Sequence, residues 1–282
     1  MGKVDYLKDF RDAKRIKALA KLIEKEVSRP INIMEVCGGH THTIMKYGLN
    51  QILPPEIEFV HGPGCPVCIM PKERIDHAIA LVQDENNIVA TLGDMIRVPG
   101  SKSSLQEERA KGKNVKMLYA PFDVLKIAKE NPDKNVIYFA IGFETTTPMT
   151  AALIERVLQE GIKNVFFHIN HVLVPPPIKA IMDSGEAKID AFIGPAHVSV
   201  ITGAQMYQEI VDLYKTPVVI AGFEPVDIME SVLWIVRQFN EGRAEVENQY
   251  RRAVTWEGNT KARQMIYKYM EPRETFRWRG IG

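Results

Sequence analysis

The sequence predicts an α/β protein built from parallel sheets. Short apolar runs alternate with helical stretches along most of the chain, which is the pattern of β-α units. The runs are continuously apolar, and continuous rather than alternating strands are typical of sheets that are covered on both faces. Each run is followed by Gly, Pro or Thr before the next helical stretch.

The individual elements follow from periodicity. Ile16, Leu19, Ala20, Ile23 and Val27 recur at helical spacing with Lys and Glu between them, which predicts an amphipathic first helix. Strands are expected at 31–36, 57–60, 88–92, 115–119, 136–141, 165–169, 191–193 and 218–221. Beyond about residue 240 two polar helices are expected, at 241–256 and 261–270.

A weak internal repeat divides the middle of the chain into two related α/β halves. The segments 36–43, 59–65 and 91–94 resemble 140–147, 192–197 and 220–223, in the same order. The expected organisation is an N-terminal helix (1–30), a half that carries the cysteines (31–133), a second half (134–240) and a helical C-terminal segment (241–282). Such halves would form a cleft between the carboxyl ends of their strands. Chance is the alternative, because any strand–Gly–Thr–helix turn has this pattern.

Composition limits the class of function. The 282 residues include 36 basic and 35 acidic side chains, and a net charge of +1 argues against nucleic acid as the main partner. The longest apolar runs, such as Val136–Phe143, are shorter than the roughly 18 residues of a membrane helix. Residues 1–17 do not resemble a secretory signal, so a cytoplasmic protein is expected. Three cysteines, two of them in Cys-x-x-Cys, then indicate metal or redox chemistry.

The first candidate motif is Cys37-Gly38-Gly39-His40, where a buried strand gives way to a helix. Backbone N–H groups and the positive end of a helix favour a thiolate at such a junction. The two glycines allow a ligand or another chain segment to approach the backbone, and the spacing can place the imidazole beside the sulfur. The alternative is a buried cysteine that acts as a small apolar residue.

The second motif is Gly62-Pro63-Gly64-Cys65-Pro66-Val67-Cys68, again directly after a strand. Two cysteines at this spacing can chelate a metal ion or cycle between dithiol and disulfide. Together with Cys37 and His40 they would also make a Cys₃His zinc set, which remains an open alternative.

A third set of candidates lies in the second half of the chain. Glu144 lies in Gly142-Phe143-Glu144-Thr145-Thr146-Thr147 and is a candidate acid or base, whereas the threonines either cap a helix or take part in function. His197 occupies the place of Cys65 in the repeat and is a further candidate. The pair of histidines at 168 and 171 is ambiguous, and those at 61 and 77 are expected to be structural.

The motifs Cys37–His40, Gly62–Cys68 and Gly142–Thr146 closely resemble those of the HypD family of hydrogenase-maturation proteins. The resemblance covers essentially the whole chain. It implies a scaffold that, with a small HypC-like chaperone, holds iron while the iron acquires two cyanides and one carbon monoxide. The cyanide would come through a HypE-like donor, and the finished Fe(CN)₂CO unit would pass to the large subunit of a [NiFe] hydrogenase.

The resemblance also implies roles for individual residues. Cys37 would be the iron ligand and His40 would lie beside it. Cys65 and Cys68 would be a redox-active pair. Glu144, Thr145, Thr146 and His197 are expected at the reaction site, and Gly38, Gly39, Gly62 and Gly64 beside the bound unit.

One departure from the family is evident. Complete members carry four further cysteines for a [4Fe-4S] cluster, and none of these is present here. Either the sequence is a fragment of a longer chain or this protein has lost the cluster. Two alternatives to the scaffold, which follow from the cysteine motifs, also stay open. A thiol–disulfide oxidoreductase would use only Cys65 and Cys68, and a Cys₃His protein would bind zinc structurally. Whether the chain is a turnover enzyme is also left open.

Overall fold

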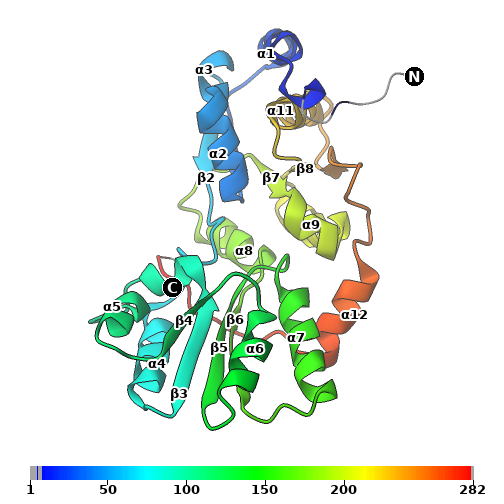
Figure 1. Cartoon of the computed structure of the whole chain (residues 1–282). Helices are drawn as coiled ribbons and strands as arrows, with labels where there is room; N and C mark the ends of the chain where they lie inside the picture. Colours follow the sequence, from blue (N-terminus) through cyan, green and yellow to red (C-terminus); the bar gives the residue numbers. More distant parts are fainter. Residues whose placement is uncertain (1–4, 6–7, 281–282) are drawn as a thin grey trace. The chain divides into compact units, whose positions relative to one another are not determined.

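Two parallel sheets organise the computed structural model, which describes residue 5 and residues 8–280 (Figure 1). The first sheet has the order β2-β1-β7-β8-β9 and the second has the order β4-β3-β5-β6. Every strand pair in both sheets is parallel. The predicted fold class, α/β with two parallel-sheet parts, is therefore confirmed.

The strands are β1 (Ile31–Glu35), β2 (Ile57–His61), β3 (Asn87–Leu92), β4 (Val115–Leu118), β5 (Asn135–Gly142), β6 (Val165–His171), β7 (Ala191–Pro195), β8 (Val218–Ala221) and β9 (Val246–Asn248). The α-helices are α1 (Ala13–Glu26), α2 (Gly38–Tyr47), α3 (Leu49–Ile52), α4 (Lys72–Gln83), α5 (Leu105–Ala110), α6 (Asp123–Glu130), α7 (Thr147–Gln159), α8 (Pro175–Ser184), α9 (Ala196–Thr202), α10 (Gln208–Tyr214), α11 (Pro225–Asn240) and α12 (Thr260–Tyr269). Short 3-10 helices are η1 (Asp9–Arg11), η2 (Gly93–Arg97) and η3 (Ala204–Tyr207).

The eight predicted strands and the first helix are all present. Helix α1 begins after Asp12, whose carboxylate accepts hydrogen bonds from the backbone N–H groups of Lys14 and Arg15. It buries Ile16, Ala20 and Ile23 as its periodicity predicted. These elements agree because apolar periodicity is a local property of the sequence.

The predicted helix over 241–256 is wrong. Helix α11 ends at Asn240, and Gly242 follows with a positive φ of 64°. Residues 246–248 then pair in parallel with β8 and form the edge strand β9. The Gln238 side chain holds this segment, since its carbonyl accepts from the N–H of Glu245 and its amide donates to the Glu247 carboxylate. The second predicted helix corresponds to α12.

The chain falls into two compact units, each built from two separate segments. Unit 1 comprises 1–64 and 174–260 and holds β1, β2, β7, β8 and β9; unit 2 comprises 65–173 and 261–282 and holds β3, β4, β5 and β6. This division differs from the predicted halves at 31–133 and 134–240, because β1 takes β7 rather than β3 as its second neighbour. The ends of the predicted terminal segments, 1–30 and 241–282, lie partly outside the described residues.

Each unit buries its own apolar core. In unit 1, α1, α2 and α11 pack side chains such as Ile23, Ile44 and Val232 against Ile33 and Ile193 of the sheet. In unit 2, α4 and α5 cover one face of the sheet while α6 and α7 cover the other (Figure 1). No helix among the described residues is long and apolar enough to cross a membrane.

Candidate functional site

Cys37 lies at the point where the strand order of its sheet reverses. It follows β1, whose neighbours are β2 on one side and β7 on the other. Parallel strands bring their carboxyl ends to one edge, and ligands of open α/β sheets bind where the order reverses. Glu144 follows β5, and the second sheet reverses order between β3 and β5. Cys37 and Glu144 therefore each lie at the carboxyl edge of a sheet, beside the point where its strand order reverses.

Cys37 is the N-cap residue of helix α2. Its backbone is extended, with φ −150° and ψ 127°, and the helix begins at the next residue. Burial raises the pKa of the thiol above its ordinary value and the Glu35 carboxylate raises it further, whereas the N–H groups of Gly39 and His40 lower it. The helix amides act as predicted, but burial outweighs them, so the neutral thiol is favoured in the metal-free protein.

The four predicted glycines surround Cys37 in different ways. A Cβ at Gly64 would lie 2.6 Å from the Cα of Cys37, and one at Gly62 would lie 2.8 Å from the carbonyl oxygen of Glu35. A Cβ at Gly39 would lie 2.7 Å from the ring of Phe223. Nothing lies within 4 Å of a Cβ built at Gly38. Three glycines thus permit close packing around the thiol, and Gly38 leaves open space beside it.

A buried carboxylate anchors the thiol turn. Glu35 is fully buried, and its carboxylate accepts hydrogen bonds from the N–H of Cys37 (3.0 Å), the Nδ1–H of His61 (2.7 Å) and the hydroxyl of Thr41. Glu35 and His61 are partners in the β1–β2 register. Burial raises the pKa of Glu35 while these hydrogen bonds lower it, and the net shift is upward. One side chain thus ties β1, β2 and α2 together at the thiol.

His40 is directed toward strand β8. It is fully buried, its Nε2–H donates to the carbonyls of Ala221 and Gly222 at 3.1 Å each, and its ring stacks on Phe223 at 4.7 Å. Burial lowers its pKa to about 4, so the ring is neutral near pH 7. The Nδ1 atom is buried and has no hydrogen-bond partner among the described residues. Metal binding by His40 stays a prediction, and Nδ1 is the nitrogen that remains for it.

His197 lies in the same unit as Cys37. It follows β7, is exposed, and its ring contacts Phe223 with centroids 4.3 Å apart. Burial of part of the ring lowers its pKa. Phe223 therefore lies between two histidines, one buried and one exposed.

Cys65 and Cys68 form a disulfide at the start of unit 2. Their Cα atoms are 5.3 Å apart, and the N–H of Cys68 donates to the Sγ of Cys65 at 3.2 Å. Cys68 is exposed and Cys65 is half-buried. The two sulfurs are thus close enough to exist as either a disulfide or a dithiol, and redox activity of the pair stays a prediction.

Glu144 is buried, whereas Thr145 and Thr146 are exposed. Thr146 is the N-cap residue of α7, but its hydroxyl donates to the carbonyl of Phe143 at 3.3 Å and makes no capping bond to the helix. The hydroxyl of Thr147 donates to the same carbonyl at 3.0 Å. The threonines therefore fix the turn rather than cap the helix, and the functional roles of Glu144, Thr145 and Thr146 stay predictions.

Among the described residues no group of three or more His, Cys, Asp or Glu side chains is arranged to hold a metal ion. The Cys₃His zinc set draws on both units, Cys37 and His40 from unit 1 and Cys65 and Cys68 from unit 2, and stays an open alternative. The 282 residues contain three cysteines, whereas a [4Fe-4S] cluster takes four.

Sequence reasoning missed Glu35 and Phe223 and classified His61 as structural. A signal for Glu35 was present, because a charged residue inside the apolar run 31–36 is expected to be buried and paired. No comparable signal marked Phe223, whose position depends on the approach of β8 to β1 through β7.

Comparison with known proteins identifies the family of this chain. Residues 14–282 match the HypD family model, described as the hydrogenase formation hypA family. The hydrogenase maturation factor HypD of Azotobacter vinelandii is 50% identical over 98% of this chain and 75% of its own length. HypD of Escherichia coli K12 is 39% identical over 98% of this chain and 76% of its own length. The chain therefore belongs to the HypD family of hydrogenase maturation factors.

Proposed function

We propose that this maturation factor is an iron scaffold, on which the Fe(CN)₂CO unit of a [NiFe] hydrogenase is assembled together with a HypC-like chaperone. Cys37 is the protein's iron ligand in this proposal, and iron is the cargo rather than a resident cofactor. A HypE-like protein delivers the cyanide groups. The finished unit passes to the hydrogenase large subunit.

The observation that carries the proposal is the setting of Cys37. Its thiol lies at the switch point of a parallel sheet, two helix amides point to it, and open space adjoins Gly38. A thiolate is a soft ligand that suits iron carrying cyanide and carbon monoxide. Because Cys37 supplies one coordination position, the others are left for a cysteine of the chaperone and for the incoming ligands.

Cys65 and Cys68 supply electrons in this scheme. Oxidation of a dithiol to a disulfide releases two electrons and two protons, which suits reductive release of cyanide from its carrier. The exposure of Cys68 supports exchange with an external thiol. No step is assigned to a [4Fe-4S] cluster.

The test is the iron content of anaerobically purified protein, co-produced with the chaperone, for the wild type and Cys37→Ala. A Cys65→Ser/Cys68→Ser double variant is the matched control, because it also removes thiols but keeps Cys37. We expect Cys37→Ala to lose iron and its cyanide infrared bands, whereas the double variant keeps the iron. An iron–cyanide species at the normal level in Cys37→Ala would refute the ligand assignment.

The Cys65–Cys68 disulfide also favours a second candidate function, a thiol–disulfide oxidoreductase. This function requires only the Cys65–Cys68 pair. The oxidoreductase would be favoured over the scaffold if the rate at which a disulfide substrate is reduced is unchanged in Cys37→Ala and lost in the double variant. In that case neither variant would bind iron.

A further inference from the structure

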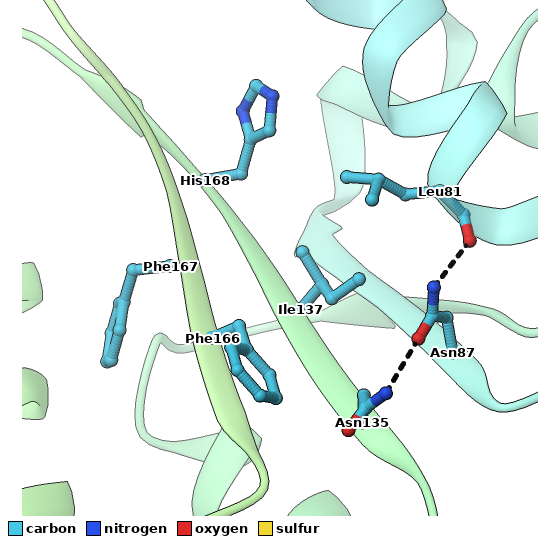
Figure 2. Close-up of a pocket in the computed structure, with 7 residues that line it drawn as sticks. All are labelled: Leu81, Asn87, Asn135, Ile137, Phe166, Phe167 and His168. Carbon is cyan, nitrogen blue, oxygen red and sulfur yellow. Dashed lines mark hydrogen bonds between the residues drawn. The ribbon is translucent and has the colours of Figure 1, made fainter.

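Unit 2 has an open, largely apolar cavity beside its edge strand β6 (Figure 2). The polar side chains of its lining are His168 and two asparagines, and the asparagine amides are already used. Asn135 donates to Asn87 at 3.1 Å, and Asn87 donates to the carbonyl of Leu81 at 2.9 Å (Figure 2). This lining does not define a ligand. An ion pair with a fully buried carboxylate lies in unit 1, behind the turn that joins β8 to α11.

This turn, residues 221–224, contacts the helix that begins after Cys37. The first two carbonyls of the turn accept from the Nε2–H of His40 at 3.1 Å each. The third carbonyl, that of Phe223, accepts from the hydroxyl of Thr43 at 2.6 Å, and the Phe223 ring stacks on His40. The position of the turn therefore sets the orientation of His40.

Asp227 holds the same turn at its amides. It lies in the first turn of α11, and its carboxylate accepts from the N–H of Glu224 at 3.2 Å. A Cβ at Gly222 would lie 2.1 Å from a carboxylate oxygen of Asp227, so the two are in close contact. Gln249 joins them, because its carbonyl accepts from the N–H of Gly222 at 3.3 Å and its amide donates to Asp227 at 2.9 Å. His40 and Asp227 thus hold one peptide segment between them.

Arg252 neutralises the buried carboxylate. Its two terminal nitrogens donate to the two oxygens of Asp227, and the guanidinium lies over the rings of Phe10 and Tyr250, 4.0 Å from each centroid. A planar guanidinium that is both bidentate and stacked has a fixed orientation, which a lysine does not reproduce. Loss of Arg252 would leave an uncompensated charge in the interior, and this favours rearrangement of the turn that Asp227 holds.

We propose that Arg252, acting through Asp227, is a positioning residue of the Cys37 site. The ion pair fixes residues 221–224, and their carbonyls in turn fix the orientation of His40 in the first turn of α2. A histidine near a bound metal is oriented by the acceptor of its ring N–H, and loss of that acceptor weakens metal binding. The inference rests on the proposed function, in which Cys37 holds iron.

The first test is the ¹⁵N NMR spectrum of the imidazole rings in the metal-free chain at pH 7. We expect separate Nδ1 and Nε2 signals for His40, because its proton is fixed on Nε2, and His40→Gln identifies them. In Arg252→Gln the two signals should move toward each other, since the ring exchanges between tautomers once the carbonyls shift. Arg252→Lys, which keeps the charge but not the bidentate geometry, should lie between these spectra. Arg237→Gln is the matched control, because Arg237 forms an exposed bidentate pair with Glu26 on the same helix.

The second test is the resistance of the iron to bipyridine, a ferrous chelator, in the anaerobic complex with the chaperone. Arg252→Gln should lose half of its iron at about a tenfold lower chelator concentration than the wild type, which is the scale for loss of a group that orients a metal-bound histidine. Gly222→Ala should act in the same direction, because its methyl group displaces Asp227 while both charges remain. Arg237→Gln should retain iron as the wild type does.

Unchanged His40 signals in Arg252→Gln would overturn the inference. Altered signals with wild-type iron retention would also overturn it, because the pair would then hold the turn without affecting the site. Iron retained in Cys37→Ala would instead refute the proposed iron ligand, and the imidazole signals would still decide whether Arg252 positions His40. Circular dichroism of each variant checks the fold, and if Arg252→Gln is unfolded, Arg252→Lys and Gly222→Ala decide by the same two measurements.

Discussion

Two strand-to-helix turns have similar sequences, one where β1 ends and one where β5 ends. They differ in whether open space remains beside the first residues of the turn. After β1, Cys37 has an extended backbone and Gly38 borders open space. At the end of β5, Gly142 has φ +153°, and a Cβ there would overlap the hydroxyl of Thr146. The first turn leaves room beside a thiol, and the second fills the equivalent room with threonine side chains.

A histidine accompanies each turn, fully buried beside the first and half-buried beside the second. His40 donates to backbone carbonyls at the end of β8 in unit 1. His171 of unit 2 contacts the hydroxyl of Thr150 at 2.8 Å and the carbonyl of Gly142 at 3.4 Å. Burial lowers the pKa of both to about 4. The comparison teaches that a shared turn geometry does not define a reactive site; the space around the first helical residues does.

The largest expected effect is the difference in stability between the alanine variants of Gly142 and Gly38. Gly142→Ala should destabilise the protein by about 3 kcal/mol, because it requires both an unfavourable φ and displacement of Thr146. Gly38→Ala should change stability by less than about 1 kcal/mol, since the added methyl meets nothing. Urea unfolding measures both. Equal losses in the two variants would mean that the turns are packed alike.

The next effect concerns acid stability. The unfolded chain binds the protons of His40 and His171 near pH 6.5, whereas the folded protein binds them only near pH 4. The contribution of the two neutral histidines to the free energy of unfolding is therefore fully present above about pH 6.5 and is lost as the pH falls toward 4. For fully buried His40 this loss is roughly 3 kcal/mol. Urea unfolding at pH 7, 5.5 and 4.5 measures the slope.

Substitution of either histidine should flatten this slope. His40→Gln and His171→Gln are expected to be less stable than the wild type at pH 7 but less sensitive to acid. Ile44→Val is the control, because it destabilises buried packing in α2 without removing a titrating group. A His40→Gln variant with the wild-type slope would contradict the neutral, buried state of this ring.

A smaller effect is expected at Glu35, which has no counterpart in the turn after β5. Glu35→Gln should cost about 2 kcal/mol, because an amide cannot accept from Cys37, His61 and Thr41 in the same geometry. Glu58→Gln, on the exposed face of β2, is the matched control and should be nearly neutral. Thermal unfolding distinguishes them. Equal melting temperatures would show that Glu35 does not anchor the thiol turn.

The smallest effect concerns the reactivity of Cys37. It is the free cysteine when Cys65 and Cys68 are oxidised. Because its pKa is raised, alkylation by iodoacetamide at pH 7.5 should be several-fold slower than in the same chain unfolded in urea. The alkylation rate of the folded protein should still rise with pH in the range where the alkylation rate of the unfolded chain has already reached its plateau. Faster alkylation in the folded protein would mean that the helix amides outweigh burial.

The sequence by itself determined the strands, the first helix and the positions of the motifs. Runs such as 136–141 are apolar regardless of what they pair with, so the strand β5 was predictable from local composition. Cys37, Glu144 and His197 each follow such a run, and this order along the chain fixes their location at strand ends. The motifs also pointed to the correct family.

Only the tertiary structure decided which strands are neighbours and which side chains meet. Residues 246–248 are polar enough to suggest a helix, yet they form β9 because the edge of β8 offers them hydrogen bonds. The burial of Glu35 depends on His61 and Thr41, and the orientation of His40 depends on the carbonyls that end β8. These pairings join residues far apart in sequence, and no local pattern specifies them because their energy exists only once the sheet has formed.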